Sequence, residues 1–298
     1  MAGRKWRMDS VTRKAYAKIN LGLDVLRRRP DGYHEVRMIM QTVDIWDLLT
    51  FTRLREPGIR LQVDVQELSA AEDNLVYRAA QLILQEYGIK EGVEITLEKH
   101  IPIAAGMAGG SSDAAAVFHG LNSLFDLSMT QRQMQKLGVR LGADIPYCIM
   151  GGTALSEGIG EMLTALPAPP ACHVVVAKPD ISVSTKFVYE NLRVDSLEHH
   201  PDIDGMQQAI KAGNLKGITR RMENVLETVT EGQYPVISRI KERMLRSGAE
   251  NALMSGSGPT VFGIFEERED ALKAASDIKE AALAGEIFVT GFFNGTDR

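Results

Sequence analysis

The stretch IPIAAGMAGGSSDAAA, residues 101–116, places glycines and serines directly before a run of alanines. Glycine lets the backbone adopt positive φ and approach a ligand closely, and alanine favours a helix. The first turn of a helix carries unpaired N–H groups and the positive end of the helix dipole, which together attract an anion. We therefore predict a phosphate-binding loop over residues 106–110. Ser111 and Ser112 are candidates to cap the following helix, contact phosphate or bind a hard metal ion.

The glycine loop matches neither of the two common nucleotide-binding motifs. No lysine follows the glycines as the P-loop pattern requires, and no G-x-G-x-x-G follows a strand as in the Rossmann fingerprint. The pattern alone leaves two readings open, a phosphate cradle and a glycine-rich turn that is merely capped by serine.

The composition of the chain indicates a globular protein and narrows its partners. The chain has 298 residues, of which 44% are hydrophobic and 24% are charged, and its formal net charge is -5. This charge disfavours nucleic acid, and no apolar run approaches the roughly 18 residues of a membrane span. The two cysteines, Cys148 and Cys172, stand among apolar neighbours and are interpreted as buried thiols. We expect a cytoplasmic protein whose partner is neither nucleic acid nor membrane.

The first half of the chain alternates between predicted strands and helices. Residues 14–25 alternate polar and apolar, which predicts a half-buried strand, and RRRPDGYH over 27–34 predicts a hairpin turn into a second strand. Further strands are predicted at 59–65 and 93–99. Asp73 is predicted to cap the intervening helix, which Gly88 ends. Thr130 and Gln133 predict a capping box for a later helix, which Gly142 closes.

The second half of the chain predicts a separate antiparallel sheet. The prolines within residues 167–170 form the best candidate linker, so we expect one domain over residues 1–166 and another over residues 167–298. Predicted strands at 172–178, 251–255, 260–265 and 286–293 enclose helices at 235–248 and 270–283. This order fits a split βαβ arrangement with helices on one face of the sheet, and the fold class is α+β.

Several polar residues in the first half are candidates for chemistry. Lys18 and Asn20 lie two residues apart on one strand, so their side chains project into the same space, unless the strand merely shows polar residues to water. Asp144, in the turn GADIPYC, stands in apolar surroundings that suit a functional carboxylate, although a lone aspartate is more often a turn former. Tyr33 and His34 at the hairpin are a candidate pair to stack on and read a base.

Three separated segments together resemble the signatures of the GHMP kinase superfamily. They are AYAKINLGLDVLRRRPDGYHEV (15–36), PIAAGMAGGSSDAAA (102–116) and LMSGSGPTVFGIF (253–265), and their order and spacing match across nearly the whole chain. Within the superfamily, AKINLGLDV, RPDGYHEV, GGSSDAAA and GADIPYC resemble the members that phosphorylate a sugar alcohol bearing a cytidine diphosphate. The combination is specific, although no single segment is.

The resemblance implies a two-domain α+β fold and a reaction in the cleft between the domains. An ATP-binding N-terminal domain of ribosomal-protein-like topology would precede a ferredoxin-like C-terminal domain on the substrate side. ATP would be the co-substrate and Mg²⁺ the cofactor. The γ-phosphoryl would move to the 2-hydroxyl of a methylerythritol moiety in the non-mevalonate route to isoprenoid precursors. The protein would be a monomer or a homodimer.

The resemblance also implies roles for residues at matching positions. Asp144 matches the general base, Lys18 the lysine beside it, and Asn20 a contact to the acceptor. Asn74 and Lys99 fall near positions on the adenine side of ATP. The remaining expected ATP-binding residues are Pro102, Ala104, Ala105, Gly106, Met107, Ala108, Gly109, Gly110, Ser111 and Ser112.

On the acceptor side, Tyr33 and Tyr189 match an aromatic pair that sandwiches the cytosine, and His34 matches a residue that reads its edge. The other expected substrate-binding residues are Thr185, Gly256, Ser257 and Gly258. Met107 departs from the commoner leucine, a nearly volume-conserving change that should preserve the path of the loop. No carboxylate matches the magnesium ligand of some superfamily members, so the metal ligands stay unknown, with Ser111 and Ser112 as candidates.

Other functions remain open from the sequence. The chain could act on another small alcohol such as homoserine or mevalonate, or be a non-catalytic nucleotide-binding module. An RNA-binding module is a third alternative, which the acidic balance disfavours.

Overall fold

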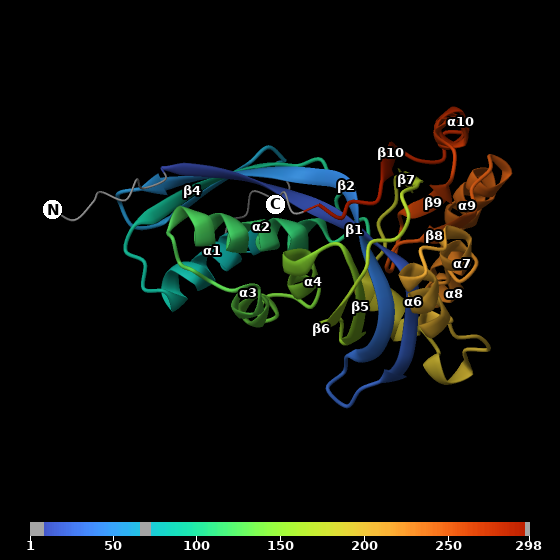
Figure 1. Cartoon of the computed structure of the whole chain (residues 1–298), viewed down its shortest axis with the longest axis horizontal. Helices are drawn as coiled ribbons and strands as arrows, with labels where there is room; N and C mark the ends of the chain where they lie inside the picture. The colour runs from blue at the N-terminus through green and yellow to red at the C-terminus, as the bar shows by residue number, and fades with distance from the viewer. Residues whose placement is uncertain (1–8, 66–72, 296–298) are drawn as a thin grey trace.

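The computed structural model describes residues 9–65 and 73–295, which form two β-sheets covered by helices (Figure 1). The first sheet contains β1 (Ser10–Arg28), β2 (His34–Leu54), β3 (Ile59–Val63), β4 (Gly92–Glu98), β5 (Thr153–Gly158) and β6 (Met162–Leu166). The second sheet contains β7 (His173–Lys178), β8 (Asn251–Met254), β9 (Val261–Phe265) and β10 (Glu286–Gly291). The predicted α+β class is confirmed.

Strands β1 and β2 form the predicted antiparallel hairpin, paired from Ser10 opposite Thr52 to Arg28 opposite His34. β2 is long enough to pair with β4 at one end and with β5 at the other. The prediction of a half-buried strand is wrong for the middle of β1, because every residue from 15 to 25 is buried. Helix α2 (Gly109–Leu124) packs on β1. Residues of the second sheet share a core cluster with β1.

The outer edge of β1 is also covered, although no strand of the first sheet pairs there. The Lys18 N–H donates to the carbonyl of Met107 at 3.1 Å, and the Leu23 N–H donates to the carbonyl of Glu223 at 2.9 Å. The Val225 N–H returns a bond to the Leu23 carbonyl at 3.1 Å. Lys18, Asn20 and Asp24 in this part of the strand are buried, whereas the polar residues at its two ends, Ser10, Thr12, Arg27 and Arg28, are exposed.

Four helices lie on one side of the first sheet (Figure 1); three of them contact its strands, and the third along the chain packs mainly on the helices before and after it. They are α1 (Leu75–Glu86), α2, α3 (Gln131–Gly138) and α4 (Ile145–Met150). Asn74, not Asp73, caps α1, because its Oδ1 accepts the Val76 N–H at 2.9 Å. The capping box of Thr130 and Gln133 is confirmed.

Two predictions near the fourth helix are wrong in detail. Helix α3 ends at Gly138, one turn before the predicted end at Gly142. The segment GADIPYC is more than a turn, because it contains the start of α4 with Asp144 at the N-cap position. Pro146 stands in the first turn of α4, where its missing N–H costs no helical hydrogen bond.

The second sheet has the strand order β10-β7-β9-β8, and every neighbouring pair is antiparallel. Helices α9 (Val236–Arg246) and α10 (Arg268–Glu280) pack against it. Its other face also meets a helix, because Val174 and Val176 share a core cluster with Ile203 and Met206 of α6 (Ile203–Lys211). The remaining helices are α5 (Thr185–Asn191), the short 3-10 helix Val194–Ser196, α7 (Leu215–Thr219) and α8 (Glu227–Gln233).

A short linker joins the two sheets along the chain, and the C-terminal segment after β10 returns to the first sheet. The first sheet ends at Leu166 and the second begins at His173. After β10, the Phe293 N–H donates to the Thr42 carbonyl at 2.9 Å, and the Phe293 ring stacks on Tyr16 with centroids 4.0 Å apart. The division into domains at residues 166 and 167 therefore stays a prediction, since the end of the chain packs on the first sheet.

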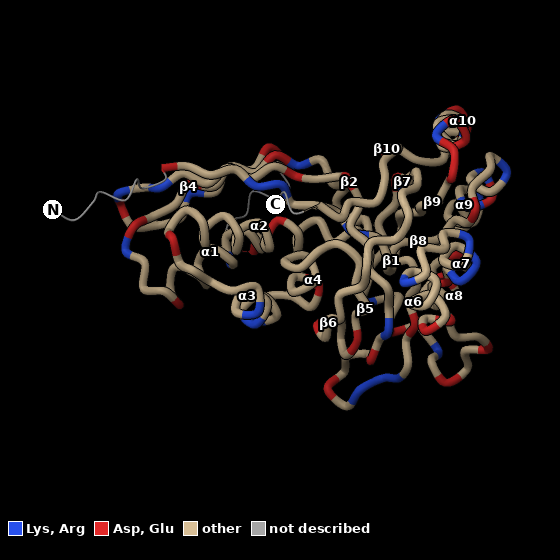
Figure 2. The backbone as a smooth tube through the Cα atoms, viewed as in Figure 1, with Lys and Arg blue, Asp and Glu red and all other residues tan. Residues whose placement is uncertain are grey.

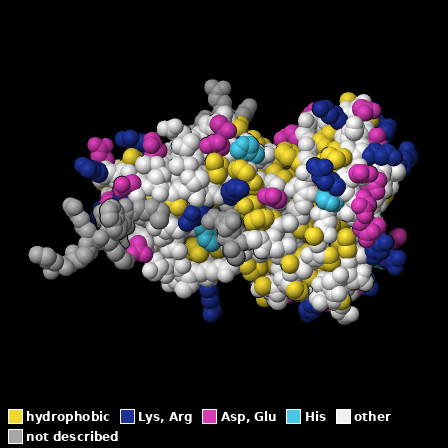
Figure 3. Space-filling model, turned by 45° about the horizontal axis from the view of Figure 1, so that its top comes forward, with side chains coloured by type: hydrophobic (Ala, Val, Ile, Leu, Met, Phe, Trp, Pro, Cys, Tyr) yellow, Lys and Arg dark blue, Asp and Glu magenta, His cyan; other side chains and the backbone are white. Residues whose placement is uncertain are grey.

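Charged residues of both signs are interspersed along the chain, and basic residues cluster near the tip of the β1–β2 hairpin (Figure 2). On the face shown in Figure 3, Lys and Arg side chains are scattered between acidic and apolar ones. Among residues 9–65 and 73–295, no helix combines the length and apolar character needed to cross a membrane.

Candidate active site

A cleft of about 1150 Å³ lies where the two parts of the chain meet. The β1–β2 hairpin, the start of α1, the loop 102–111, the residue before α4, helix α5 and the loop 256–257 all contribute to its walls. The predicted site residues that line it are Lys18, Asn20, Tyr33, His34, Asn74, Lys99, Pro102, Ala104, Ala105, Gly106, Ala108, Gly109, Gly110, Ser111, Asp144, Thr185, Tyr189, Gly256 and Ser257. Three predicted residues, Met107, Ser112 and Gly258, do not line it.

The glycine loop presents helix N–H groups to this cleft. Gly106 has φ of +71° and Ala108 has φ of +57°, so the chain turns sharply before α2 begins at Gly109. No side chain caps this helix, which leaves its first N–H groups available to an anion. The prediction that a serine caps the helix is wrong, because Ser111 and Ser112 lie inside its first turns.

Ser112 and Met107 face the interior and not the cleft. The Ser112 hydroxyl donates to the carbonyl of Tyr16 at 2.7 Å, so it is engaged with β1 and unsuited to a phosphate or a metal ion. The Met107 side chain is 1% exposed and packs in the core beneath the loop. Both residues hold the glycine loop against β1, and Ser111 is the serine that lines the cleft.

Lys18 brings together the polar residues on the floor of the cleft. Its Nζ donates to Asn20 Oδ1 at 2.9 Å and to the Gly106 carbonyl at 3.2 Å, and it lies 3.9 Å from Asp144 Oδ2. The Lys18 side chain is 6% exposed, whereas that of Asp144 is 34% exposed. The buried Ile145 and Pro146 follow Asp144 in α4, and the buried Lys18 ammonium lies beside its carboxylate; the prediction of apolar surroundings did not include this ammonium. The arrangement places a carboxylate and a fixed positive charge next to the glycine loop.

Lys99 lies under the glycine loop in a buried cluster of charges. Its Nζ donates to Asp113 Oδ2 at 2.8 Å and also to Asp47, and an alanine Cβ at Gly109 would lie 3.4 Å from it. Burial lowers the pKa of Lys99, but the carboxylates of Asp113 and Asp47 outweigh burial and raise this pKa above its ordinary value. Burial also raises the pKa of Asp113 well above its ordinary value. The Lys99 ammonium already binds two carboxylates. The expected position of Lys99 on the adenine side of ATP stays a prediction.

An aromatic wall closes the far side of the cleft. The rings of His34 and Tyr189 lie 5.1 Å apart at 37°, while Tyr33 is 60% exposed. Burial, and then the Asp144 carboxylate, raise the pKa of Tyr189. Burial, and then the charge of Arg28, lower the pKa of His34, which favours the neutral imidazole. The ring that contacts Tyr189 is thus His34, and a sandwich between Tyr33 and Tyr189 stays a prediction.

The loop 255–258 approaches the glycine loop from the second part of the chain. An alanine Cβ at Gly256 would lie 3.2 Å from the Gly106 carbonyl, and the hydroxyls of Ser257 and Thr185 lie 2.8 Å apart. Gly258 turns away from the cleft, because a Cβ there would lie 2.6 Å from the Met254 sulfur.

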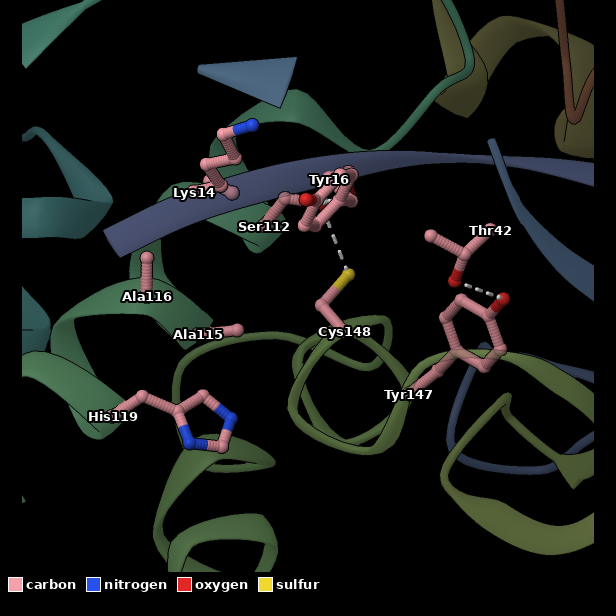
Figure 4. A pocket seen from close by; sticks show the side chains of 10 residues that line it. Lys14, Tyr16, Thr42, Ser112, Ala115, Ala116, His119, Tyr147 and Cys148 are labelled. Carbon is pink, nitrogen blue, oxygen red and sulfur yellow. Dashed lines mark hydrogen bonds between the residues drawn. The ribbon is translucent and has the colours of Figure 1, made fainter. Parts of the chain in front are cut away.

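A second cavity, beside α2, is too small for a substrate. Its volume is about 10 Å³, and the Ser112 hydroxyl lies 3.4 Å from the Cys148 sulfur in its wall (Figure 4). The Thr42 and Tyr147 hydroxyls lie 3.0 Å apart nearby. Space of this size suits a single water molecule.

The residues that could bind a metal are few. In the two described ranges, no group of three or more His, Cys, Asp or Glu side chains could hold a metal ion. Mg²⁺ often uses only one or two protein oxygens together with substrate phosphates. Ser111 lines the cleft at the first turn of α2, and the site fits an ion bound mainly by phosphate.

Sequence reasoning missed Asp47 and Asp113. Both are buried, and Asp47 accepts the Ile101 N–H at 2.7 Å besides binding Lys99. Asp113 carried a usable signal, since it stands directly after the glycines and serines in a run that is otherwise alanine. Asp47 carried none, because an aspartate in a long strand ordinarily indicates an exposed position.

The family described as GHMP kinases N terminal domain matches residues 74–152, and GHMP kinases C terminal matches residues 206–283. A 4-diphosphocytidyl-2-C-methyl-D-erythritol kinase from Lachnospira eligens is 51% identical over 286 residues, covering 96% of this chain and 99% of that protein. The enzyme of the same name from Enterococcus faecalis is 48% identical over 269 residues, covering 90% and 95%.

Solved structures show the same relationship. A crystal structure of 4-(cytidine 5'-diphospho)-2C-methyl-D-erythritol kinase superposes with a TM-score of 0.82 and 33% identity, covering 96% of this chain and 100% of that one. A homoserine kinase from Cytophaga hutchinsonii has a TM-score of 0.79 but 21% identity, covering 97% and 96%, and shares the fold alone. Because the first relatives match nearly the full length at such identity, the chain belongs to the 4-diphosphocytidyl-2-C-methyl-D-erythritol kinase family of the GHMP kinases.

Proposed function

We propose that this chain transfers the γ-phosphoryl group of ATP to the 2-hydroxyl of 4-diphosphocytidyl-2-C-methyl-D-erythritol, a step toward isoprenoid precursors. One observation carries the proposal: the glycine loop, the Lys18–Asp144 pair and the aromatic wall of His34 and Tyr189 line a single cleft. A phosphate site, a proton acceptor and a base-stacking wall are the parts that this reaction needs.

Asp144 is proposed to accept the proton of the acceptor hydroxyl. The hydroxyl oxygen then forms a bond to the γ-phosphorus, the bond between this phosphorus and the β,γ-bridging oxygen breaks, and ADP leaves with that oxygen. Asp144 suits this role because it is 34% exposed within the cleft and no hydrogen bond from a side-chain cap ties it to α4. Positioning supplies most of the remaining rate, since little covalent work falls to the protein.

Lys18 and the start of α2 are proposed to stabilise the charge that spreads over the transferred group. The Lys18 ammonium is nearly buried, so its charge is less screened by water than an exposed one. Asn20 Oδ1 accepts a hydrogen bond from this ammonium, and Asn20 Nδ2, which donates to the Met38 sulfur at 3.2 Å, is proposed to contact the acceptor in the cleft. When bound, Mg²⁺ would neutralise phosphate charge, and Ser111 is the residue proposed to hold it. The cofactor role of Mg²⁺ and the assignment of Ser111 rest on the oxygen donors of the cleft.

The acceptor's cytosine is proposed to stack on Tyr189, with His34 and Tyr33 at the mouth of the cleft. Thr185, Gly256 and Ser257 line the same side. A cytoplasmic location, the absence of a nucleic-acid partner, and a monomer or homodimer are part of the proposal.

Measuring ADP release with each of four acceptors tests the proposed function. The purified chain is incubated with ATP, Mg²⁺ and the cytidine-bearing substrate, homoserine, mevalonate or no acceptor, and phosphorus NMR locates the new phosphate. We expect release with the cytidine-bearing substrate and a phosphate on its 2-hydroxyl. Turnover with homoserine or mevalonate alone would overturn the substrate assignment. No turnover with any acceptor would favour a non-catalytic nucleotide-binding module, and a salt-sensitive shift of RNA would favour an RNA-binding one.

A further inference from the structure

Asn224 is a buried amide, 2% exposed, in the segment that precedes α8. The backbone around it pairs with the outer edge of β1: the Leu23 N–H donates to the Glu223 carbonyl at 2.9 Å, and the Val225 N–H donates to the Leu23 carbonyl at 3.1 Å. This segment is therefore hydrogen-bonded to the strand that carries Lys18 and Asn20.

The Asn224 side chain reaches from this segment to the loop 255–258. Its Nδ2 donates to the carbonyl of Met254 and to the carbonyl of Gly256, each at 2.8 Å. Its Oδ1 accepts the Leu226 N–H at 3.0 Å. Both amide hydrogens and the amide oxygen are thus used, and both carbonyls flank Ser255.

Ser255, in turn, is hydrogen-bonded to the glycine loop. Its hydroxyl is fully buried and donates to the Gly106 carbonyl at 3.0 Å. The same carbonyl accepts a hydrogen bond from Lys18 Nζ at 3.2 Å. The two loops are in close contact there, because an alanine Cβ at Gly106 would lie 2.3 Å from the Ser255 carbonyl oxygen.

These hydrogen bonds connect β1 to the segment of Asn224, Asn224 to the backbone on both sides of Ser255, Ser255 to Gly106, and Gly106 back to Lys18 on β1. We propose that Asn224 is a positioning residue for phosphoryl transfer, which holds the loop 255–258 against Gly106 and thereby sets Lys18 beside Asp144. The inference rests on the proposed function. It reaches beyond the residues that line the cleft, since Asn224 itself does not line it.

The test is Asn224→Asp, which keeps the size of the side chain but turns an oxygen toward two carbonyl oxygens. The loop should withdraw from Gly106, and a displacement on the order of 1 Å at a reacting centre lowers turnover up to about 100-fold. We expect kcat to fall about 10- to 100-fold while the KM for ATP stays within about threefold, since the N–H groups of α2 are untouched. Kinetics are measured well below the unfolding temperature of each variant.

Asn251→Asp is the matched control. Asn251 begins β8, its Nδ2 donates to the Thr219 carbonyl at 2.7 Å and its Oδ1 accepts the Ala252 N–H at 2.8 Å, but it does not line the cleft. This variant should lose thermal stability while keeping kcat within about twofold of the unchanged chain. A fall of kcat in both variants in proportion to their loss of stability would show a merely structural role and overturn the proposal.

A second variant, Ser255→Ala, keeps the test decisive if Asn224→Asp does not fold. It removes the one hydroxyl that joins the loop to Gly106, and we expect kcat to fall about 3- to 10-fold, the worth of one hydrogen bond. Unchanged kcat in Ser255→Ala or in folded Asn224→Asp would overturn the proposal. An unchanged chain that lacks kinase activity would instead refute the proposed function, so the two failures are distinguishable.

Discussion

Replacing Gly106 with alanine should disable catalysis through a steric effect that can be worked from the structure. Gly106 has φ of +71°, where an alanine costs about 1–2 kcal/mol. Its new Cβ would lie 2.3 Å from the Ser255 carbonyl oxygen, whereas ordinary contacts begin at 3.4 Å. The two loops must therefore separate by about 1 Å, since neither contact atom is the end of a flexible side chain.

That separation acts directly on the proposed centre, because the Gly106 carbonyl accepts hydrogen bonds from Lys18 and from Ser255. A misplacement of about 1 Å can cost on the order of 100-fold in rate. We expect Gly106→Ala to lower kcat about 100-fold in an ADP-release assay with the cytidine-bearing substrate.

Gly88→Ala is the matched control for the strain of a positive φ. Gly88 has φ of +60° and nothing lies within 4 Å of the Cβ that alanine would add. It should lose about 1 kcal/mol in the free energy of unfolding, measured with urea, and keep its kcat. The reasoning is refuted if Gly106→Ala retains a kcat within about twofold of Gly88→Ala.

Three further changes probe the proton acceptor, the aromatic wall and the buried charges. Asp144→Asn should lower kcat about 10²–10⁴-fold with little change in ATP affinity by calorimetry, and near-normal kcat would remove it as the base. Tyr189→Ala should raise the acceptor KM about 5- to 100-fold, whereas Phe187→Ala on the exposed face of α5 should not; equal effects would exclude stacking on Tyr189. Burial raises the pKa of Asp113, so the folded chain holds this proton more tightly than the unfolded chain, and this contribution to stability is lost as pH rises from 3.8 through the raised pKa. Asp113→Asn removes this loss, so urea unfolding should favour the variant increasingly as the pH rises from 3.8 toward the raised pKa, and a constant difference would contradict the raised pKa.

Much of the local structure was predictable, because it depends on neighbours in the chain. The hairpin over β1 and β2 follows from alternation and a proline-glycine turn, and the capping box of Thr130 and Gln133 follows from a spacing of three residues. Lys18 and Asn20 were expected on one side of a strand, and their side chains are hydrogen-bonded.

The assignments that failed depended on contacts between distant segments. The middle of β1 is buried because α2 and the second part of the chain pack around it, and no pattern within residues 14–25 encodes that. Ser112 was an equal candidate with Ser111 until the fold placed the Tyr16 carbonyl within 2.7 Å of its hydroxyl. The position of Lys18, 3.9 Å from Asp144 although far away in sequence, also depended on the fold.

The amino-acid sequence by itself determined where strands and helices form and where the chain exposes amides to an anion, because backbone preference and side-chain periodicity act over a few residues. Only the tertiary structure decided which polar groups work together. Ser255 and Gly106 are 149 positions apart in the sequence, yet the Ser255 hydroxyl donates to the Gly106 carbonyl. Lys18 donates to the same carbonyl, so this group of contacts forms only when the two sheets have packed together. Such contacts depend on the closure of long loops and on burial, which no local spacing records.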